Sequence, residues 1–354
     1  MNNQNIFFVF CSLLCFIAPI IFCGLNSKNI LNKIKLETSI IFLPVVSLII
    51  YCCLFWTNSE FISDTYIFKF ISPFLAALIF ALLSLFSSKF SIRAFYVIIL
   101  SNIVVFGFNY APRIIPSYSL LINQLLLVFI WCFITLSFRL LNTLSGIVYG
   151  QLFVFCFGFY LLYIIGCAPD SLGFIVLCIG LSSLVFALKS WPPKTNLISN
   201  DQVDVLGFVI GAFMVNGSTE MLFSPLLIFI LLPLCEISLA LFKKITFIKE
   251  WKNLYQNTSC TKAIVSGLSP QIVANHFLRT TLLMLVIGCF QVFAPSQYSL
   301  LLISFIVCLW QIYRLSEWQN LTDGLIDSSK NIHKEVRRSL KELKNNLKKR
   351  EDHK

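Results

Sequence analysis

The sequence predicts an all-α, polytopic membrane protein with about eleven transmembrane helices. Apolar residues make up 58% of its 354 residues and charged residues only 12%, about half the charged share of a soluble domain. The mean hydropathy is +0.84, and the apolar residues come in long runs. Such runs are typical of helices that cross a bilayer.

The predicted spans are separated by short polar loops, and the last span is followed by a long charged segment. Residues 1–315 are therefore predicted to form the transmembrane domain, and residues 316–354 a basic cytosolic tail. The eighth span is the shortest and carries Asp204 near its start. The spans are 6–24, 38–56, 69–86, 94–109, 118–138, 146–166, 171–188, 203–217, 222–242, 279–294 and 298–315.

The basic residues of the loops predict the orientation. If alternate loops are cytosolic, one side keeps only Lys69 and Arg113 as cations. The positive-inside bias then places the N-terminus outside and the C-terminus in the cytosol. This placement also argues against nucleic acid as the partner of a chain with net charge +11. The other side receives Lys28, Lys33, Lys35, Lys89, Arg93, Arg139, Lys189, Lys194, Lys243, Lys244, Lys249, Lys252, Lys262, Arg279 and the tail from Arg314.

The tail has apolar residues at three- and four-residue spacing among many lysines and arginines. This pattern predicts an amphipathic helix with a narrow apolar seam. It either lies against anionic headgroups or forms a coiled coil with a partner or a second copy, which would make a homodimer. The seam residues are Ile332, Val336, Leu340, Leu343 and Leu347.

Few residues in the spans have the chemistry of a catalytic or metal site. The 13 cysteines are scattered and form no CxxC pair, so they are interpreted as small buried hydrophobes. Two of the three histidines lie in the tail, which argues against a histidine proton relay. Glu236 follows Pro233, which can break the helix and free a carbonyl. Glu236 is either functional or a buried carboxyl that holds two helices together.

The loop after residue 189 carries the most informative pattern. Pro192 and Pro193 keep it out of a helix, and Lys194, Asn200 and Asp201 precede Asp204 and a Leu-Gly-Phe sequence at 206–208. The loop resembles Pro-Pro-Ala-Lys-Ile-Phe-Met-Gly-Asp-x-Gly-Ser-x-x-Leu-Gly-Phe of the polyprenyl-phosphate sugar-1-phosphate transferases. These enzymes move a sugar-1-phosphate from a UDP-sugar to undecaprenyl phosphate in cell-envelope synthesis.

Further segments are similar to motifs of this family, in the family's order. The segment 84–93 resembles its Gly-Leu-x-Asp-Asp segment, 142–146 lies at its Asp-Gly-x-Asp-Gly, and 233–236 resembles its Pro-x-x-Asp helix. Residues 255–256 and 267–269 resemble parts of its last large cytosolic loop. The resemblance implies a bacterial inner (cytoplasmic) membrane location, and abundant Phe, Ile, Lys and Asn fit an AT-rich bacterial genome.

The chain departs from the family at the motif acids. Ser87 and Ser88 stand at the acidic pair, Asn142 and Ser145 at the acids of Asp-Gly-x-Asp-Gly, and Asn200 at the acid of Met-Gly-Asp. In the family these groups bind Mg2+ and the nucleotide. An amide or hydroxyl carries no charge to hold Mg2+, and loss of its ligands would slow transfer by about 10^3-fold or more.

Three hypotheses follow. The first is a catalytically degenerate transferase homologue that binds polyprenyl phosphate or a UDP-sugar, or that accompanies an active enzyme. The second is an active transferase with an altered Mg2+ site that uses Asp201, Asp204 or Glu236. The third is an unrelated transporter or structural membrane protein. Under the first two, the substrate-binding residues are Pro192, Pro193, Lys194, Asp201, Asp204 and Glu236.

Overall fold

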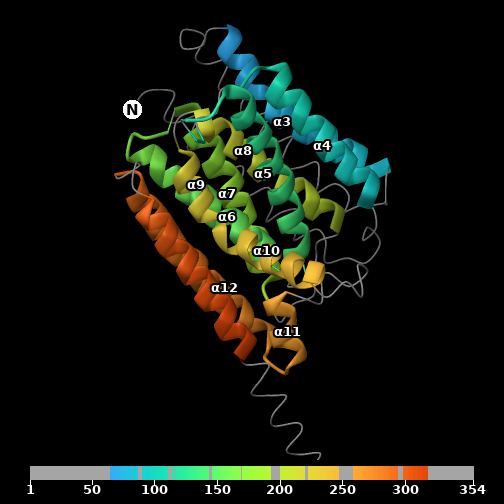
Figure 1. Ribbon diagram of the computed structural model, residues 1–354, viewed down its shortest axis with the longest axis vertical. Coiled ribbons are helices and arrows are strands. Elements are labelled where there is room, and N and C mark those ends of the chain that lie inside the picture. The colour runs from blue at the N-terminus through green and yellow to red at the C-terminus, as the bar shows by residue number, and fades with distance from the viewer. Residues whose placement is uncertain are drawn as a thin grey trace, which may run out of the picture.

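Every regular element that the computed structural model describes is an α-helix (Figure 1). The described residues are 64–86, 90–110, 114–115, 117–142, 146–168, 170–192, 200–219, 222–246, 258–293 and 298–317. The helices are α3 (Asp64–Phe86), α4 (Phe90–Gly107), α5 (Leu120–Leu141), α6 (Ile147–Ile164), α7 (Asp170–Ser190), α8 (Asn200–Thr219), α9 (Phe223–Phe229), α10 (Leu231–Thr246), α11 (Ser259–Val265), α12 (Pro270–Gln291) and Ser299–Glu317.

Each predicted span from 69–86 to 298–315 coincides with a helix or with the α9–α10 pair. Four described helices are long and apolar enough to cross a membrane: α5, α6, α12 and Ser299–Glu317. The bent pair of α9 and α10 makes a fifth if it is one span. The protein is therefore a multi-pass, all-helical chain by helix length and composition, while the count of eleven stays a prediction. Spans 6–24 and 38–56 and the tail seam lie outside the described residues.

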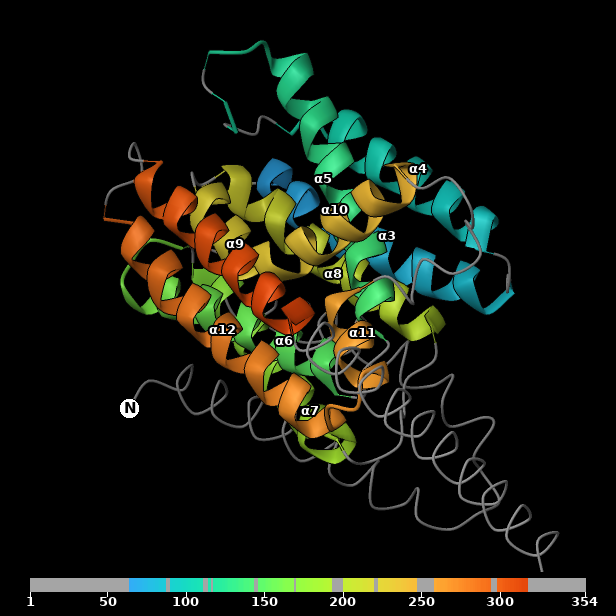
Figure 2. The ribbon, with the colours of Figure 1, turned by 60° about the horizontal axis from the view of Figure 1, so that its bottom comes forward.

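The helices form a bundle around two central pairs, α5 with α8 and α6 with α7 (Figure 1). Helices α3 and α4 lie at one edge of the bundle, and α12 and Ser299–Glu317 lie at the opposite edge in both ribbon views (Figure 2). The core between them is rich in phenylalanine, and the rings of Phe155, Phe159 and Phe213 contact one another there. Because lipid is as apolar as these side chains, close packing is what holds such a bundle together.

Gly207 allows the closest approach of the two central helices α5 and α8. A Cβ at this position would lie 2.9 Å from Thr135 Cα and 3.0 Å from Phe138 Cβ. One residue on, the Phe208 carbonyl accepts a hydrogen bond from Trp131 Nε1 at 3.0 Å. The Leu-Gly-Phe sequence at 206–208 thus has a packing role, because only a residue without a side chain fits at its centre.

The span predicted at 222–242 is broken, as its proline predicted. Helices α9 and α10 meet at a 68° bend, three residues before Pro233. Proline has no N–H, so Pro233 cannot donate to the Phe229 carbonyl four residues earlier. Gln151 Nε2 donates to that carbonyl instead, at 2.8 Å, and Thr281 Oγ1 donates to Gln151 Oε1 at 3.0 Å. One glutamine therefore satisfies the broken helix and joins it to α12, which makes the break tolerable in lipid.

Substituting Gly207→Ala tests the close α5–α8 contact. The new methyl group would meet the α5 backbone, which cannot rotate away, so we expect a loss of about 1–3 kcal/mol of stability. Gly107→Ala is the matched control, because a Cβ there meets nothing within 4 Å and alanine favours a helix over glycine. Thermal unfolding of the purified protein in detergent measures both. Equal melting temperatures for the two variants would contradict the close packing.

Candidate functional site

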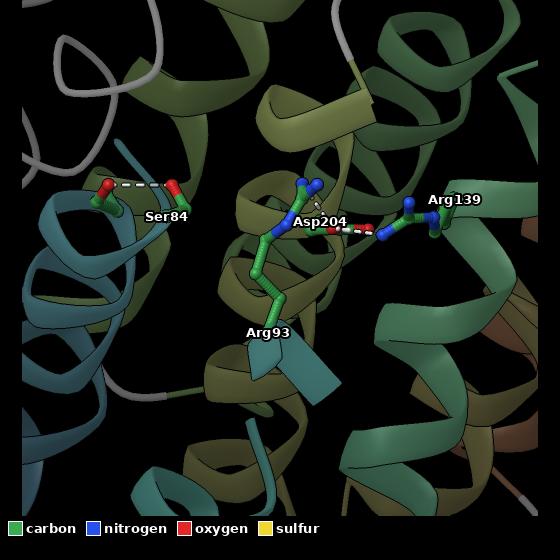
Figure 3. A network of polar contacts seen from close by, with 5 residues as sticks. Ser84, Arg93, Arg139 and Asp204 are labelled. Carbon is green, nitrogen blue, oxygen red and sulfur yellow. Dashed lines mark hydrogen bonds and ion pairs between the residues drawn. The ribbon is translucent and has the colours of Figure 1, made fainter. Parts of the chain in front are cut away.

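Asp204 forms ion pairs with two arginines from two other helices (Figure 3). Its Oδ2 atom accepts hydrogen bonds from Arg93 Nη1 at 3.2 Å and from Arg139 Nη1 at 2.8 Å. The three residues are 3–6% exposed. We call Arg93, Arg139 and Asp204 the ion triad. It joins α4, α5 and α8 through one carboxylate oxygen.

The ends of the helices place these charges favourably. Arg139 lies in the last turn of α5, where the negative end of the helix dipole favours a cation. Asp204 lies near the N-terminus of α8, where the positive end favours an anion. Arg93 lies in the first turn of α4, where the dipole opposes a cation. The ion pair with Asp204 therefore has to offset both the unfavourable interaction of Arg93 with the helix dipole and the cost of removing its guanidinium group from water.

Arg93 and Arg139 lie within α4 and α5 rather than in the loops to which the sequence assigned them. The predicted span 94–109 began one residue after Arg93, and the predicted span 118–138 ended one residue before Arg139. Helices α4 and α5 contain these two arginines. Buried arginines at helix ends are ionic groups with structural or functional roles rather than mere retention signals. The sequence carried a usable signal, because both arginines border apolar runs that contain no other charge.

The ion triad flanks three of the segments that the resemblance singles out. Arg93 is five residues after Ser88, Arg139 is three residues before Asn142, and Asp204 is four residues after Asn200. Asn142 caps the end of α5, with its backbone N–H donating to the Arg139 carbonyl at 3.3 Å. Asn200 and Asp201 begin α8. Ser87, Ser88, Ser145, Pro193 and Lys194 lie outside the described residues.

A second contact brings the loop after α7 to the same end of the bundle. Gly146, which precedes α6, has a φ of +78°, and a Cβ there would lie 3.0 Å from the Ser190 and Trp191 backbone. Trp191 Nε1 donates to Asn275 Oδ1 of α12 at 3.2 Å, and Pro192 is buried beside it. Gly146 and the segment 190–192 are therefore neighbours, with the left-handed glycine at their contact.

Glu236 holds α10 against α11. Its carboxylate accepts hydrogen bonds from the backbone N–H of Ser259, at 3.1 Å, and from the Ser259 hydroxyl. The Cys260 thiol donates to the same carboxylate at 3.5 Å. Burial raises the pKa of the Cys260 thiol, and the charge of Glu236 raises it further. Glu236, which is 2% exposed, thus has the contacts of a carboxyl that joins two helices.

The segment 267–269 turns the chain from α11 into α12. Gly267 has a φ of +102°, a conformation that favours glycine. Ser269 caps α12, and its hydroxyl accepts from the Ile272 backbone N–H at 3.3 Å. This part of the loop therefore has a conventional turn-and-cap role, while residues 255–256 lie outside the described residues.

An apolar groove of about 230 Å³ opens beside the ion triad, between α4 and α5. Phe129 and Ile98 lie at its surface, 65% and 49% exposed. Arg93 and Asp204 line the groove, so a charged group and a lipid-facing opening belong to one cavity. The apolar lining comprises Phe80, Ala94, Val97, Ile98, Phe129, Cys132, Phe133 and Leu136, with Thr135 beside them.

The described side chains do not fit a magnesium ion. Mg2+ requires several oxygen ligands whose charge compensates its own. The Asp204 carboxylate is already compensated by two guanidinium groups, and Glu236 is bound to α11. Within the described ranges, no group of three or more His, Cys, Asp or Glu side chains has an arrangement that could hold a metal ion. The donor set around the ion triad suits an anion better than a cation.

No protein-family model and no curated protein matches this chain.

Substituting Asp204→Asn tests the ion triad. Removing the carboxylate leaves Arg93 and Arg139 facing each other as like charges in a buried site, so we expect a loss of about 3–5 kcal/mol. Glu317→Gln is the matched control, since Glu317 is an exposed acid at a helix end and surface charges contribute about 0–1 kcal/mol. Thermal unfolding and membrane expression levels measure both variants. Wild-type stability for Asp204→Asn would contradict a structural role for the triad.

Proposed function

We propose that this chain is a divergent, catalytically degenerate homologue of the polyprenyl-phosphate sugar-1-phosphate transferases, in the cytoplasmic membrane of a bacterium. It binds polyprenyl phosphate without transferring a sugar-1-phosphate. The single observation that carries the proposal is the ion triad. It lies between the three segments that correspond to the family's acidic motifs, and its chemistry suits an anion.

The triad supports the loss of catalysis. Phosphoryl transfer depends on positioning and on neutralising the charge that develops on the transferred group, mostly by a metal. In this chain, serine and asparagine stand at the five acid positions, and the acid that lies nearby, Asp204, is held by two arginines. To bind Mg2+, Asp204 would have to give up two buried ion pairs, which is unfavourable.

The contacts among helix ends support the proposed topology. The triad places the start of α4, the end of α5 and the start of α8 at one end of the bundle. Gly146 lies against Trp191, and Trp191 donates a hydrogen bond to Asn275. These contacts bring the start of α6, the end of α7 and the first half of α12 to the same end of the bundle. The basic residues of the loops at this end, by the positive-inside bias, support a cytosolic position for this end of the bundle and for the C-terminus.

The groove supports a lipid phosphate as the ligand. An isoprenoid chain is apolar and matches the lining contributed by α4 and α5, while its phosphate would reach Arg93 at the charged part of the groove. Arginine binds phosphate through two parallel N–H groups. The Arg93 guanidinium could therefore bind a lipid phosphate while it still pairs with Asp204. A neutral lipid has no charged group for such an interaction.

An exchange assay tests the catalytic part of the proposal. Membranes that contain the chain, given undecaprenyl phosphate, Mg2+ and a UDP-sugar, are expected to exchange labelled UMP no faster than a vector control. The missing metal ligands predict a rate at least about 10^3-fold below that of an active transferase. Exchange above the vector control would establish the second hypothesis, an active enzyme with an altered metal site.

A gain-of-binding variant is the counterpart of that assay. If the three segments meet as in the family, the triple substitution Ser88→Asp, Asn142→Asp and Asn200→Asp should raise the affinity for Mn2+, measured by titration of the purified protein. Unchanged affinity would count against the shared site.

Filling the groove tests the lipid part of the proposal. Ala94→Trp places a large ring in the groove lining, so we expect binding of polyprenyl phosphate to weaken about tenfold or more, measured by native mass spectrometry or a labelled lipid. Ile103→Trp is the matched control, because Ile103 lies on α4, is 56% exposed and is not part of the lining. If neither the wild type nor the control binds the lipid, the third hypothesis, a transporter or structural protein, would be favoured.

A further inference from the structure

Two arginines lie together on the outer edge of the bundle, away from α4 and α5. Arg279 of α12 and Arg314 of the Ser299–Glu317 helix are both exposed, and each is close enough to His276 to act on its charge. The two helices run side by side at the edge of the bundle (Figure 1). We call Arg279, Arg314 and His276, with Trp310 and Tyr313 beside them, the edge site.

The edge site borders a broad apolar surface. The two helices are long and apolar enough to cross a membrane, and the Ser299–Glu317 helix is the least buried of the candidate spans, at 28% of its window. From the arginines, exposed apolar side chains continue along both helices. They are Leu282, Leu283, Val286 and Phe290 on α12, and Leu302, Ile303, Phe305 and Ile306 on its neighbour.

The aromatic residues of the edge site mark the boundary of this apolar surface. Trp310 and Tyr313 are 56% and 60% exposed, and tryptophan and tyrosine are enriched where a span meets the headgroups. The Arg314 guanidinium lies over the Trp310 ring, 5.4 Å from its centroid. This cation–π contact orients the charge at the boundary rather than letting it extend into water.

The charge of the edge site is positive among the described residues. Neither Arg279 nor Arg314 forms an ion pair with another residue of the described ranges. The nearest acid along the helix is Glu317, which accepts a hydrogen bond from Tyr313 Oη at 2.6 Å. Two guanidinium groups that both act on one imidazole make the local potential positive, so an anion bound beside them would lower the energy of the arrangement.

We propose that the edge site binds the phosphodiester headgroup of an anionic phospholipid from the cytosolic leaflet. The acyl chains would lie along the exposed apolar faces of α12 and the Ser299–Glu317 helix. Basic pockets between transmembrane helices on the cytoplasmic side are known to bind such headgroups. This inference goes beyond the proposed function, because it concerns different helices and a different lipid from the groove beside the ion triad.

The test measures lipid-dependent stability of the full chain purified in detergent. Cardiolipin or phosphatidylglycerol is expected to raise the melting temperature, while phosphatidylcholine is not. Each arginine near the membrane surface contributes about a fivefold gain in affinity for anionic lipid, so Arg279→Gln with Arg314→Gln should lower the apparent affinity by about 25-fold. Native mass spectrometry should show correspondingly less co-purified anionic lipid.

Three controls keep the test decisive. Lys189→Gln removes an exposed cation at the end of α7 and should leave the lipid response unchanged. Arg279→Lys with Arg314→Lys keeps the charges and should retain most of it. Ala94→Trp, which fills the groove, should also retain it, so failure of the groove and failure of the edge site are distinguishable.

An equal response to phosphatidylcholine would overturn the proposal. So would a full response in the double glutamine variant, provided that its melting temperature without added lipid matches the wild type and shows it to be folded.

Discussion

The structure depends on one buried carboxylate that satisfies two guanidinium groups. Asp204 brings together the start of α4, the end of α5 and the start of α8, and the hydrogen bond from Trp131 to the Phe208 carbonyl adds a second polar contact between α5 and α8. Apolar contacts alone do not fix how far one helix slides along another in lipid, because the surroundings are equally apolar. The triad fixes this register at the end of the bundle where the charges lie, and it does so with a single acid.

The same constraint is the physical basis for proposing that this chain is not an active transferase. A cluster of carboxylates repels itself until a metal neutralises it, so in an enzyme the metal joins the loops as well as assisting the reaction. Here the joining is done by arginine, which is always charged and needs no metal. The contact between these helices therefore needs no metal. Under the proposed function, the arginines would attract a lipid phosphate at the place where a transferase would hold magnesium, and without a metal acting as a Lewis acid the bound phosphate would not be transferred.

The sequence predicted the helices far better than the site. Each apolar run predicted as a span within the described residues overlaps a helix or the α9–α10 pair, because a run of about 20 apolar residues has few alternatives to a membrane helix. Hydropathy could not locate the helix ends to within one residue. At Arg93 and Arg139 this precision was needed, because a shift of one residue decides whether the arginine belongs to a loop or to a helix in which it pairs with Asp204. Pro233 predicted the break in the ninth span. The hydrogen bond that Gln151 donates to the Phe229 carbonyl at this break could not be predicted, because the two residues are 78 positions apart in the sequence. The short helix α11, capped by Thr258, was missed because its seven residues are far too few to be recognised as a membrane span.

The residues at the positions that resemble the transferase motifs have two kinds of physical role: some are needed for packing, and others would be needed only to bind a metal. This difference explains how a chain could keep the fold while losing the catalytic activity. Gly207 is needed for the close approach of α5 and α8, Phe208 accepts the Trp131 hydrogen bond, and Pro233 breaks the ninth span. All three have packing or backbone roles that are required whether or not a substrate binds. The acids of the motifs are replaced by serine and asparagine at Ser87, Ser88, Asn142, Ser145 and Asn200, and a side chain there is not needed for the packing contacts of Gly207, Phe208 and Pro233. Under the proposed function, a chain that keeps the packing residues and loses the acids would retain the bundle and the groove, the features needed to bind a lipid rather than to modify it.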